Sequence, residues 1–353
     1  MKYWNENLKS MDEYIPGEQP LDAEDIIKLN TNENPFPPSQ TALEAIKAAA
    51  NNDLRLYPSP AADDLRKAFG DSVGLAAENI FAANGSDEIF TLLFRGFIEK
   101  DGLAAFPYPS YALYDTVAAA CGIPYEHVPL RENFTYDLDA FLQKPYSLVV
   151  IANPNNPTGS YCSPEQIETF CGKFKGLFVV DEAYIDFYGG SAVSLVQKFD
   201  NLIVTRTFSK SYSLAGLRVG IAAAHPDIIK GFLKLKDSYN LDRIAVAGAC
   251  AALGDERSFN YNTSQIRHCK SYLEERLADL EFDIVPSRGN FLFVKHKGIA
   301  GGELYSKLKE KGILVRHFDK EVQRDYIRIT VGTMGEIKTL CKELEEIISL
   351  ARQ

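Results

Sequence analysis

Short apolar runs alternate with longer amphipathic stretches through the first part of the chain. The runs contain three or four consecutive apolar residues and lie at 80–83, 103–106, 148–151, 178–180 and 202–204. Runs of this length predict buried strands, and most of the stretches between them have the spacing of amphipathic helices. Strands that alternate with helices predict an α/β domain with a largely parallel sheet, in which ligands bind at the carboxyl ends of the strands.

The pattern changes after residue 220. Helical spacing covers 228–237 and 243–280, with an interruption near Gly254, and a further helix is expected at 302–311. A closing helix begins at Met334, and strand-like segments lie at 282–285, 291–294, 313–316 and 326–330. This order predicts a second, smaller α+β domain.

The first forty residues fit neither pattern. Residues 1–28 are polar and rich in turns, and an Asn- and Pro-rich loop then precedes a helix that Ser39 or Thr41 would cap. We therefore expect three parts in the chain. They are an N-terminal arm with part of the small domain in 1–40, a large domain in 41–245, and the remaining small domain in 246–353.

Bulk composition limits the possible functions. Of the 353 residues, 46% are apolar and 24% are charged, as is typical of a globular protein. A formal charge of −10 argues against sequence-independent binding to nucleic acid or to an anionic membrane. Neither a signal peptide nor a membrane span is recognisable, and the six cysteines form no C-x-x-C pair, so we expect a cytoplasmic protein. The five histidines lack the spacing of metal ligands.

A lysine surrounded by phosphate-binding groups follows the run at 202–204. Arg218 lies beyond it, and hydroxyl groups flank Lys210 at Thr207, Ser209, Ser211 and Ser213. An isolated lysine is commonly a solvated surface residue. An enzyme that holds a phosphorylated aldehyde covalently, however, needs an amine for the bond, with hydroxyls and a guanidinium for the phosphate. Pyridoxal phosphate is such a cofactor, so Lys210 is the central candidate.

Other candidate ligands follow the remaining strands. Gly85 and Ser86 open a helix whose N-terminus would bind an anion or simply be capped. Asn156 lies between two prolines, which would hold its amide in one position to bond a ligand oxygen. Asp181 ends a buried strand, where a carboxylate needs a cationic partner such as a protonated pyridine nitrogen.

Three further features have two interpretations each. Tyr111, at a strand-to-helix junction, would stack on a flat ligand ring or pack in the core. Arg316 and Arg328 lie within or at the end of apolar strands, which suits a surface salt bridge and anion recognition about equally. The loop at 30–34 would be a plain surface loop or the wall of a polar pocket.

Five motifs occur in the order typical of one known family. They are G-S-D-E at 85–88, N-N-P-T-G at 155–159, D-E-A-Y at 181–184, S-K at 209–210 and A-G-L-R at 215–218. Together they resemble the fold type I, class II pyridoxal-phosphate aminotransferases, although any one of them would be weak evidence. The resemblance runs from about residue 14 to the C-terminus. Its histidinol-phosphate aminotransferase branch is indicated by N-E-N-P at 32–35, L-Y-P at 56–58 and I-R-I-T-V-G-T at 327–333.

The resemblance implies a fold and a cofactor. It implies an α/β large domain with a mainly parallel seven-stranded sheet flanked by helices. A smaller α+β domain would come from both chain ends, and pyridoxal phosphate would be bound in a homodimer.

The resemblance also assigns catalytic and cofactor-binding roles to matching residues. Lys210 would bond the cofactor aldehyde and move the substrate proton, while Asp181 would keep the pyridine nitrogen protonated. Tyr184 and Asn156 would hydrogen-bond the phenolic oxygen, and Tyr111 would stack on the ring. The cofactor phosphate would be held by Ser86, Asp87, Thr207, Ser209, Arg218 and Tyr57 of the partner subunit.

Substrate recognition is implied at Tyr14, Asn34, Arg316 and Arg328. Two departures from the family pattern concern the loop after L-Y-P and the arm. Ser59 stands where the family usually has aspartate, and residues 12–27 contain no arginine, which some relatives use there to bind the substrate phosphate. Phosphate recognition therefore depends more heavily on Arg316 and Arg328.

The expected reaction is a ping-pong transamination. Glutamate, which becomes 2-oxoglutarate, would supply the amino group that converts imidazole-acetol phosphate to L-histidinol phosphate in histidine biosynthesis. Two alternatives within the class are an aromatic amino-acid aminotransferase and a threonine-phosphate decarboxylase. A non-enzymatic regulator of the same fold is disfavoured, because such proteins carry an added DNA-binding domain for which this chain has no room.

Overall fold

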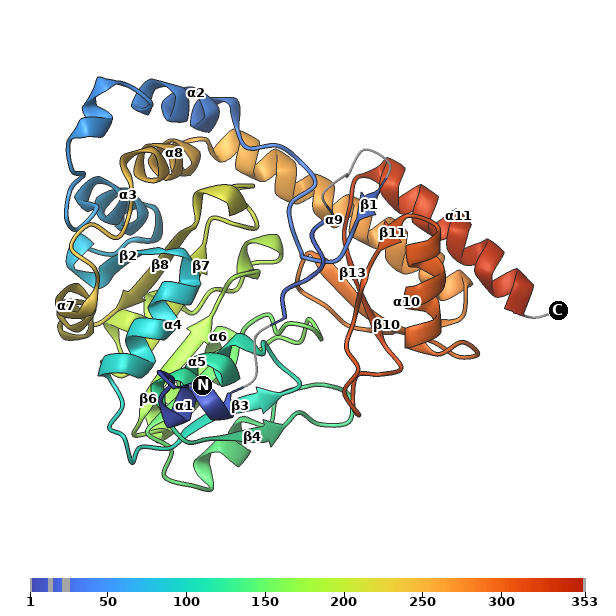
Figure 1. Ribbon diagram of the computed structural model, residues 1–353, viewed down its shortest axis with the longest axis horizontal. Helices are drawn as coiled ribbons and strands as arrows, with labels where there is room; N and C mark the ends of the chain where they lie inside the picture. Colours follow the sequence, from blue (N-terminus) through green and yellow to red (C-terminus); the bar gives the residue numbers. More distant parts are fainter. Residues whose placement is uncertain (1, 12–14, 21–25, 352–353) are drawn as a thin grey trace.

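A seven-stranded sheet forms the centre of the large part of the molecule (Figure 1). The computed structural model describes residues 2–11, 15–20 and 26–351, and in it the strands run in the order β2-β8-β7-β6-β5-β3-β4. Strand β8 is antiparallel to β2 and β7, and the other pairs are parallel. The strands are β2 (Ile80–Asn84), β3 (Ala104–Tyr108), β4 (Tyr125–Pro129), β5 (Leu148–Ala152), β6 (Leu177–Asp181), β7 (Leu202–Thr207) and β8 (Val219–Ala224).

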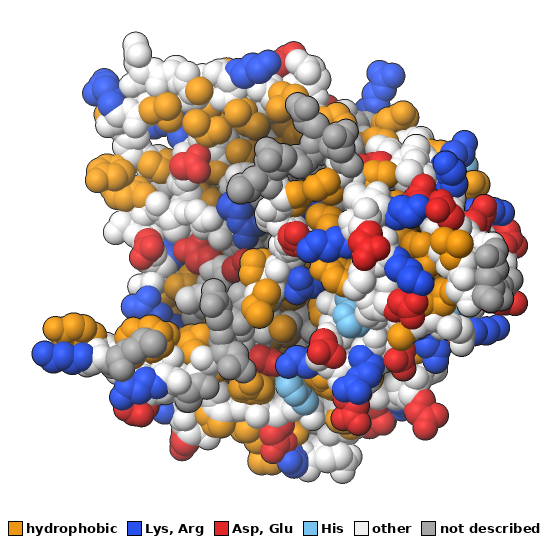
Figure 2. All heavy atoms as spheres, turned by 45° about the vertical axis from the view of Figure 1, so that its right-hand side comes forward, with side chains coloured by type: hydrophobic (Ala, Val, Ile, Leu, Met, Phe, Trp, Pro, Cys, Tyr) orange, Lys and Arg blue, Asp and Glu red, His pale blue; other side chains and the backbone are white. Residues whose placement is uncertain are grey.

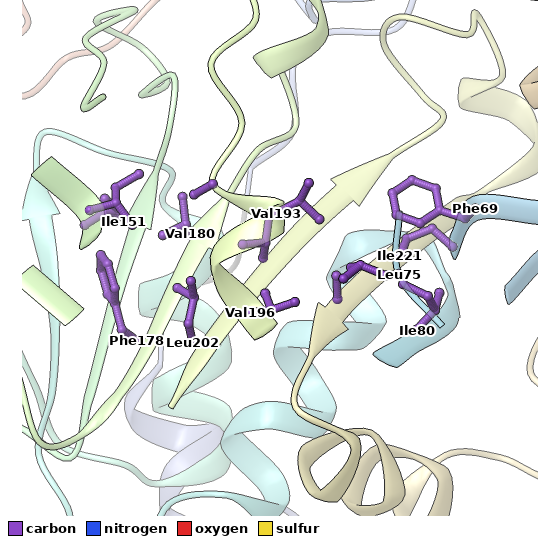
Figure 3. Close-up of a cluster of buried hydrophobic side chains, with 14 of the residues drawn as sticks. Phe69, Leu75, Ile80, Ile151, Phe178, Val180, Val193, Val196, Leu202 and Ile221 are labelled. Atoms are coloured by element: carbon purple, nitrogen blue, oxygen red, sulfur yellow. The ribbon is translucent and has the colours of Figure 1, made fainter. Parts of the chain in front are cut away.

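Both faces of this sheet are buried, which explains the continuous apolar runs. Val149 and Ile151 of β5 belong to one hydrophobic cluster, while Leu148 and Val150 of the same strand belong to another. Figure 3 shows side chains of the first cluster. Alternate residues of a strand point to opposite faces, so a strand covered on both sides needs apolar residues at every position.

Helices cover the two faces as the alternating pattern predicts (Figure 1). The first cluster includes residues of α2 (Gln40–Ala49), α3 (Asp63–Val73), α6 (Pro164–Lys173) and α8 (Arg243–Gly254). The second includes residues of α4 (Gly85–Gly96), α5 (Leu113–Cys121) and α7 (Pro226–Leu235). Ser39 caps α2 through a bond from the Ala42 amide, as expected from the sequence. Short 3-10 helices cover Asn52–Arg55, Ala77–Asn79, Leu138–Leu142, Ile185–Phe187, Val193–Gln197 and Ala215–Leu217.

A smaller antiparallel sheet, in the order β12-β13-β10-β9, lies beside three helices near the C-terminal end (Figure 1). Its strands are β9 (Phe282–Val285), β10 (Phe291–His296), β12 (Arg316–His317) and β13 (Ile327–Thr330). The helices are α9 (Glu256–Asp279), α10 (Gly301–Glu310) and α11 (Met334–Ala351). Near the other chain end, β1 (Ile27–Lys28) pairs in parallel with β11 (Ile313–Leu314), and α1 (Glu6–Ser10) contacts α5. Segments from both chain ends therefore meet in the pair of β1 with β11, while α1 lies against the large part of the molecule.

The expected fold class is confirmed, and most differences are local. Each of the five apolar runs overlaps a strand of the large sheet, and the helical break near Gly254 separates α8 from α9. The single strand expected at 313–316 is wrong. Residues there form two short strands in different sheets. Strand β11 pairs with β1, and β12, which begins two residues later, pairs with β13. Strand β4 was missed because Glu126 and His127 interrupt its apolar pattern at the sheet edge.

Charged side chains of both signs are interspersed over the face shown in Figure 2. Within the part of the chain that the structure describes, each helix is too short or too polar to span a bilayer.

Candidate active site

A cleft of about 1130 Å³ is lined by residues of both the seven-stranded sheet and the four-stranded sheet. Its lining includes the last residues of β3, β6 and β7, and arginines from β12 and β13. Ligands of open α/β sheets bind at this end of the strands. Twelve of the expected site residues line it: Ser86, Asp87, Tyr111, Asn156, Asp181, Tyr184, Thr207, Ser209, Lys210, Arg218, Arg316 and Arg328.

Lys210 presents an amine to this cleft. Desolvation, reinforced by the positive charge of Arg328, lowers the pKa of Lys210 to about 8. Its Nζ donates a 3.0 Å hydrogen bond to the Thr31 carbonyl, and Nδ2 of Asn34 donates to the carbonyl of Lys210 itself at 2.9 Å. A lysine with a lowered pKa has a larger neutral fraction near pH 7, which is the form that attacks an aldehyde or accepts a proton.

Asp181 is a buried carboxylate at the end of β6. Its Oδ2 accepts a 2.7 Å hydrogen bond from the hydroxyl of Tyr114, and its Oδ1 accepts one of 3.0 Å from Thr205. Burial raises the pKa of Asp181 to about 6, and the two hydroxyl donors oppose that rise. Tyr114 was not predicted from the sequence; it is fully buried and packs edge-on against Tyr111 at 5.6 Å between ring centroids. No local motif marks this tyrosine.

A cup lined by groups of the kind that bind anions, called the anion cup below, lies between α4 and the loop after β7. Ser86 and Asp87 lie in the first turn of α4, where unpaired amides and the helix dipole attract a phosphate. Arg218 reaches this turn, donating to Asp87 Oδ2 at 3.2 Å and to Ser209 Oγ at 3.5 Å. Thr207 Oγ1 accepts from the Ser209 amide at 3.1 Å and so shapes the other wall. The cup therefore combines backbone amides, hydroxyls and a guanidinium.

Gly85 lets Arg218 approach the cup. A Cβ at Gly85 would lie 2.7 Å from Nη2 of Arg218, and the backbone of Gly85 has φ of 75°. The backbone conformation therefore favours glycine, and a larger residue would also displace the Arg218 guanidinium from this position.

Arg328 connects the small sheet to the loop that carries Asn156. Its Nη1 donates a 2.5 Å hydrogen bond to Asn156 Oδ1, and its Nη2 donates to the Asn30 carbonyl at 2.6 Å. Arg316 lies directly opposite Arg328 in the pairing of β12 with β13, and donates to the carbonyls of Ile15 and Pro16 at 3.0 and 3.2 Å. Like charges opposite each other on paired strands repel, so an anion between them would be favoured.

The comparisons with known proteins agree with this geometry. Residues 24–344 match the family model described as "Aminotransferase class I and II". A protein of Oceanobacillus iheyensis named histidinol-phosphate aminotransferase 1 is 43% identical over 351 residues, covering 98% of each chain. A histidinol-phosphate aminotransferase of Clostridium beijerinckii is 43% identical over 352 residues, covering 99% of this chain and 98% of the relative.

The chain belongs to the class I and II aminotransferase family. A solved histidinol-phosphate aminotransferase of Sinorhizobium meliloti, in complex with pyridoxal-5'-phosphate, superimposes with a TM-score of 0.90. It is 26% identical, and the match covers 99% of this chain and 98% of that structure. The resemblance found in the five motifs is therefore confirmed.

The residues of this family member fit pyridoxal phosphate chemically. One cleft presents an amine at Lys210, a carboxylate at Asp181 whose two oxygens are already oriented, an aromatic ring at Tyr111 and the anion cup at α4. These are the groups that an aldehyde, a pyridine nitrogen, a flat ring and a phosphate require.

Tyr184 is the second expected partner of the cofactor's phenolic oxygen, and it is held on two sides. Its hydroxyl accepts a 3.0 Å hydrogen bond from Nδ2 of Asn32, and its ring packs edge-on against Phe291 at 5.0 Å. Asn32 belongs to the polar loop at 30–34, and the sequence predicted no individual role for it. Its contact depends on a residue 152 positions away, so no local pattern marks it.

A buried ion network behind Lys210 was also missed. Arg206 donates to Glu182 at 3.2 Å and pairs with Asp186, which in turn accepts a 2.5 Å bond from the hydroxyl of Ser211. Because Ser211 follows Lys210 directly, the network anchors the segment that carries the amine.

Two expected site residues, Tyr57 and Asn34, are not among the described residues that line the cleft. Tyr57 is 77% exposed and stacks on Tyr239 with 4.3 Å between ring centroids. Asn34 contacts the backbone of Lys210 and Ser211, and its role as a substrate ligand stays a prediction. Tyr14 lies outside the described residues.

Proposed function

We infer that this chain is a pyridoxal-phosphate-dependent aminotransferase that interconverts L-histidinol phosphate and imidazole-acetol phosphate, with 2-oxoglutarate and glutamate as the second pair. The substrate assignment follows the relatives named histidinol-phosphate aminotransferase, which match at 43% identity over 98% of the chain or more. The observation in the structure that supports aminotransferase chemistry is the set of groups in the cleft. There, the Lys210 amine lies among a buried carboxylate, an anion cup and two paired arginines.

When bound, pyridoxal phosphate supplies a ring that accepts the electron pair released at the substrate α-carbon. The carboxylate of Asp181 would pair with the protonated ring nitrogen and stabilise its positive charge. Tyr114 and Thr205 keep both carboxylate oxygens oriented, so little reorganisation is needed. Tyr111 would stack on the ring, and Asn156 with Tyr184 would hydrogen-bond its phenolic oxygen.

Lys210 would have two tasks. Its Nζ would hold the cofactor at the aldehyde carbon, and in exchange for that bond the same amine would take up and then release the proton of the substrate α-carbon. A pKa of about 8 keeps a useful neutral fraction of this amine near pH 7. The backbone of Lys210 would stay in place during this exchange, because Asn34 and the Asp186 network hold it from two sides.

Arg328 and Arg316 would recognise the anionic end of both substrates. The amino donor carries a carboxylate where histidinol phosphate carries a phosphate ester. A planar guanidinium binds either group with two parallel hydrogen bonds, so one site would accept both.

We also propose a homodimer, a cytoplasmic location and the domain limits 1–40, 41–245 and 246–353. The exposed pair of Tyr57 and Tyr239, with Leu54 and Leu56 nearby in sequence, offers an apolar surface for a second copy. Tyr57 would then reach the phosphate cup of the other protomer. Sedimentation of the holoenzyme tests the dimer, and a Tyr57→Phe variant that keeps wild-type phosphate and cofactor affinity would contradict the role of this hydroxyl.

A half-reaction panel tests the substrate assignment. Holoenzyme is mixed separately with L-histidinol phosphate, glutamate, phenylalanine and threonine phosphate, and the absorbance of the cofactor is followed through a single turnover. We expect rapid changes with L-histidinol phosphate and glutamate and slower ones with the other two. Silence with L-histidinol phosphate would refute the proposal. A dominant response to phenylalanine, or release of carbon dioxide from threonine phosphate, would favour the aromatic aminotransferase or the decarboxylase instead.

A further inference from the structure

Asn32 is a buried residue between the large sheet and the four-stranded sheet. Its side chain is 1% exposed, and its backbone φ of 53° lies in the left-handed region. Residues other than glycine adopt this conformation rarely, asparagine more often than most, and those that do concentrate at functional sites. The contacts of Asn32 show what fixes it.

The small sheet and the turn before β10 hold Asn32 from one side. The Asn32 amide donates to Thr330 Oγ1 at 3.0 Å, and the same hydroxyl donates to Asn32 Oδ1 at 3.0 Å. Asn290 donates from its side chain to the Asn32 carbonyl at 3.2 Å. The Thr330 amide donates to the Leu29 carbonyl at 2.9 Å, which extends the attachment along the loop.

The two ends of the Asn32 amide face different hydroxyl groups. Its Oδ1 accepts from Thr330 Oγ1, and its Nδ2 donates to the Tyr184 oxygen at 3.0 Å. A hydroxyl oxygen that accepts a hydrogen bond from one direction directs its own proton to another. Asn32 therefore constrains the direction in which the hydroxyl of Tyr184 can donate.

We propose that Asn32 is a positioning residue. It orients the Tyr184 hydroxyl so that this group donates a hydrogen bond to the phenolic oxygen of bound pyridoxal phosphate. The inference rests on the proposed function, which supplies that oxygen. Arg328 donates a hydrogen bond to the Asn30 carbonyl of the same loop. The loop at 30–32 therefore contacts both Arg328, the expected substrate ligand, and Tyr184, the expected cofactor ligand.

A purely structural role makes a different prediction. If Asn32 only stabilised its loop, its loss would weaken the protein to the same extent whether or not Tyr184 carried a hydroxyl. A positioning role requires that the effect on cofactor binding disappear when that hydroxyl is removed.

A double-mutant cycle separates the two roles through the dissociation constant of pyridoxal phosphate, measured by titrating apoprotein without any amino substrate. Asn32→Asp is nearly isosteric and tolerates the left-handed backbone, but its carboxylate only accepts, so the Tyr184 hydroxyl would turn toward it. Asn32→Gly removes the donor without adding charge. We expect each change to weaken cofactor binding about tenfold in the wild-type background and Asn32→Gly to weaken it less than twofold in a Y184F background.

Asn290→Ser is the matched control, because it removes a donor from the Asn32 carbonyl without touching Tyr184. We expect it to lower the unfolding temperature and to change the cofactor dissociation constant less than twofold. Equal losses for Asn32→Gly in both backgrounds, or an equal loss for Asn290→Ser, would overturn the inference while the proposed function stands. Wild-type protein that binds no pyridoxal phosphate would overturn both.

Discussion

Nη1 of Arg328 donates a 2.5 Å hydrogen bond to Oδ1 of Asn156. This contact joins the expected substrate arginine to an expected cofactor ligand across the two sheets. Because Oδ1 accepts from the guanidinium, the amide's own N–H groups are directed away from Arg328. One side chain would therefore orient the amide that we expect to bind the cofactor and present positive charge to the substrate.

Replacing Arg328 with lysine should damage both tasks. Lysine keeps the charge but lacks the planar guanidinium group. It therefore cannot hydrogen-bond Asn156, Asn30 and a substrate anion at the same time. We expect kcat/KM for histidinol phosphate to fall by about 100-fold, since charge-assisted hydrogen bonds contribute roughly 1.5–3 kcal/mol each. Steady-state kinetics measure this. Arg316→Lys is the comparison and should cost about tenfold, because Arg316 is less buried. A loss below threefold for Arg328→Lys would remove this arginine from the site.

Tyr114→Phe should raise the pKa of Asp181 above its value of about 6, because the lost hydroxyl stabilises the carboxylate. Ionised Asp181 is needed to pair with the ring nitrogen, so activity and cofactor affinity should fall first at low pH. We expect the acidic limb of kcat/KM to move upward by about one pH unit, equivalent to about 1.4 kcal/mol. The measurement is a pH profile of both quantities.

Tyr136→Phe provides a matched control for Tyr114→Phe. Tyr136 is also buried, but its hydroxyl donates to the Ala152 carbonyl rather than to Asp181. The acidic limb should stay in place in this variant. The same shift in both variants would mean that any lost buried hydroxyl disturbs the site.

Lys210→Met should stabilise the apoprotein near neutral pH. Desolvation lowers the pKa of Lys210 from 10.5 to about 8, so the unfolded chain binds this proton more tightly than the folded one. The lysine therefore costs stability below pH 8, and the cost shrinks as pH rises toward 10.5. We expect Lys210→Met apoprotein to be more stable by roughly 1–3 kcal/mol at pH 7 and by much less at pH 10.

Denaturant unfolding of both apoproteins across this pH range measures the effect of Lys210→Met. A stability difference that does not change with pH would show that the Lys210 amine is not desolvated in the folded protein.

Gly220→Ala should open the phosphate cup. A Cβ at this position would lie 2.5 Å from the Gly85 carbonyl carbon and 2.6 Å from the Ser86 amide nitrogen, both of which are backbone atoms. Strand β8 and the start of α4 would have to separate, so we expect cofactor affinity to fall at least tenfold and stability to fall by about 1–3 kcal/mol. Gly216→Ala is the control in the same segment. Its Cβ would meet nothing within 4 Å, and both quantities should stay near wild type.

Local chemistry in the sequence was sufficient to select most of the candidate residues that the structure gathers in one cleft. Lys210 with its hydroxyls, Asp181 at a strand end and Asn156 between prolines were recognisable because each is defined by its immediate neighbours. The structure gathers them in one cleft because parallel strands bring their carboxyl ends to one edge. Ser39 capped α2 for the same local reason.

The contacts that the sequence did not reveal join distant residues. Tyr114 and Asp181 are 67 positions apart, and the aromatic residue lies on a helix where packing in the core would explain it equally well. The split of 313–316 into β11 and β12 likewise depended on which strands were available as partners.

The sequence by itself determined the alternation of strands and helices, the lysine segment and the family, because these depend on residues that are neighbours in the chain. Only the tertiary structure decided that Asn32 meets Tyr184 and that Arg328 meets Asn156. Those pairs form because β13 pairs beside β10 and carries Arg328 and Thr330 to the loop at 30–32. Strand order is a property of the whole packed chain, and no local pattern of residues specifies it.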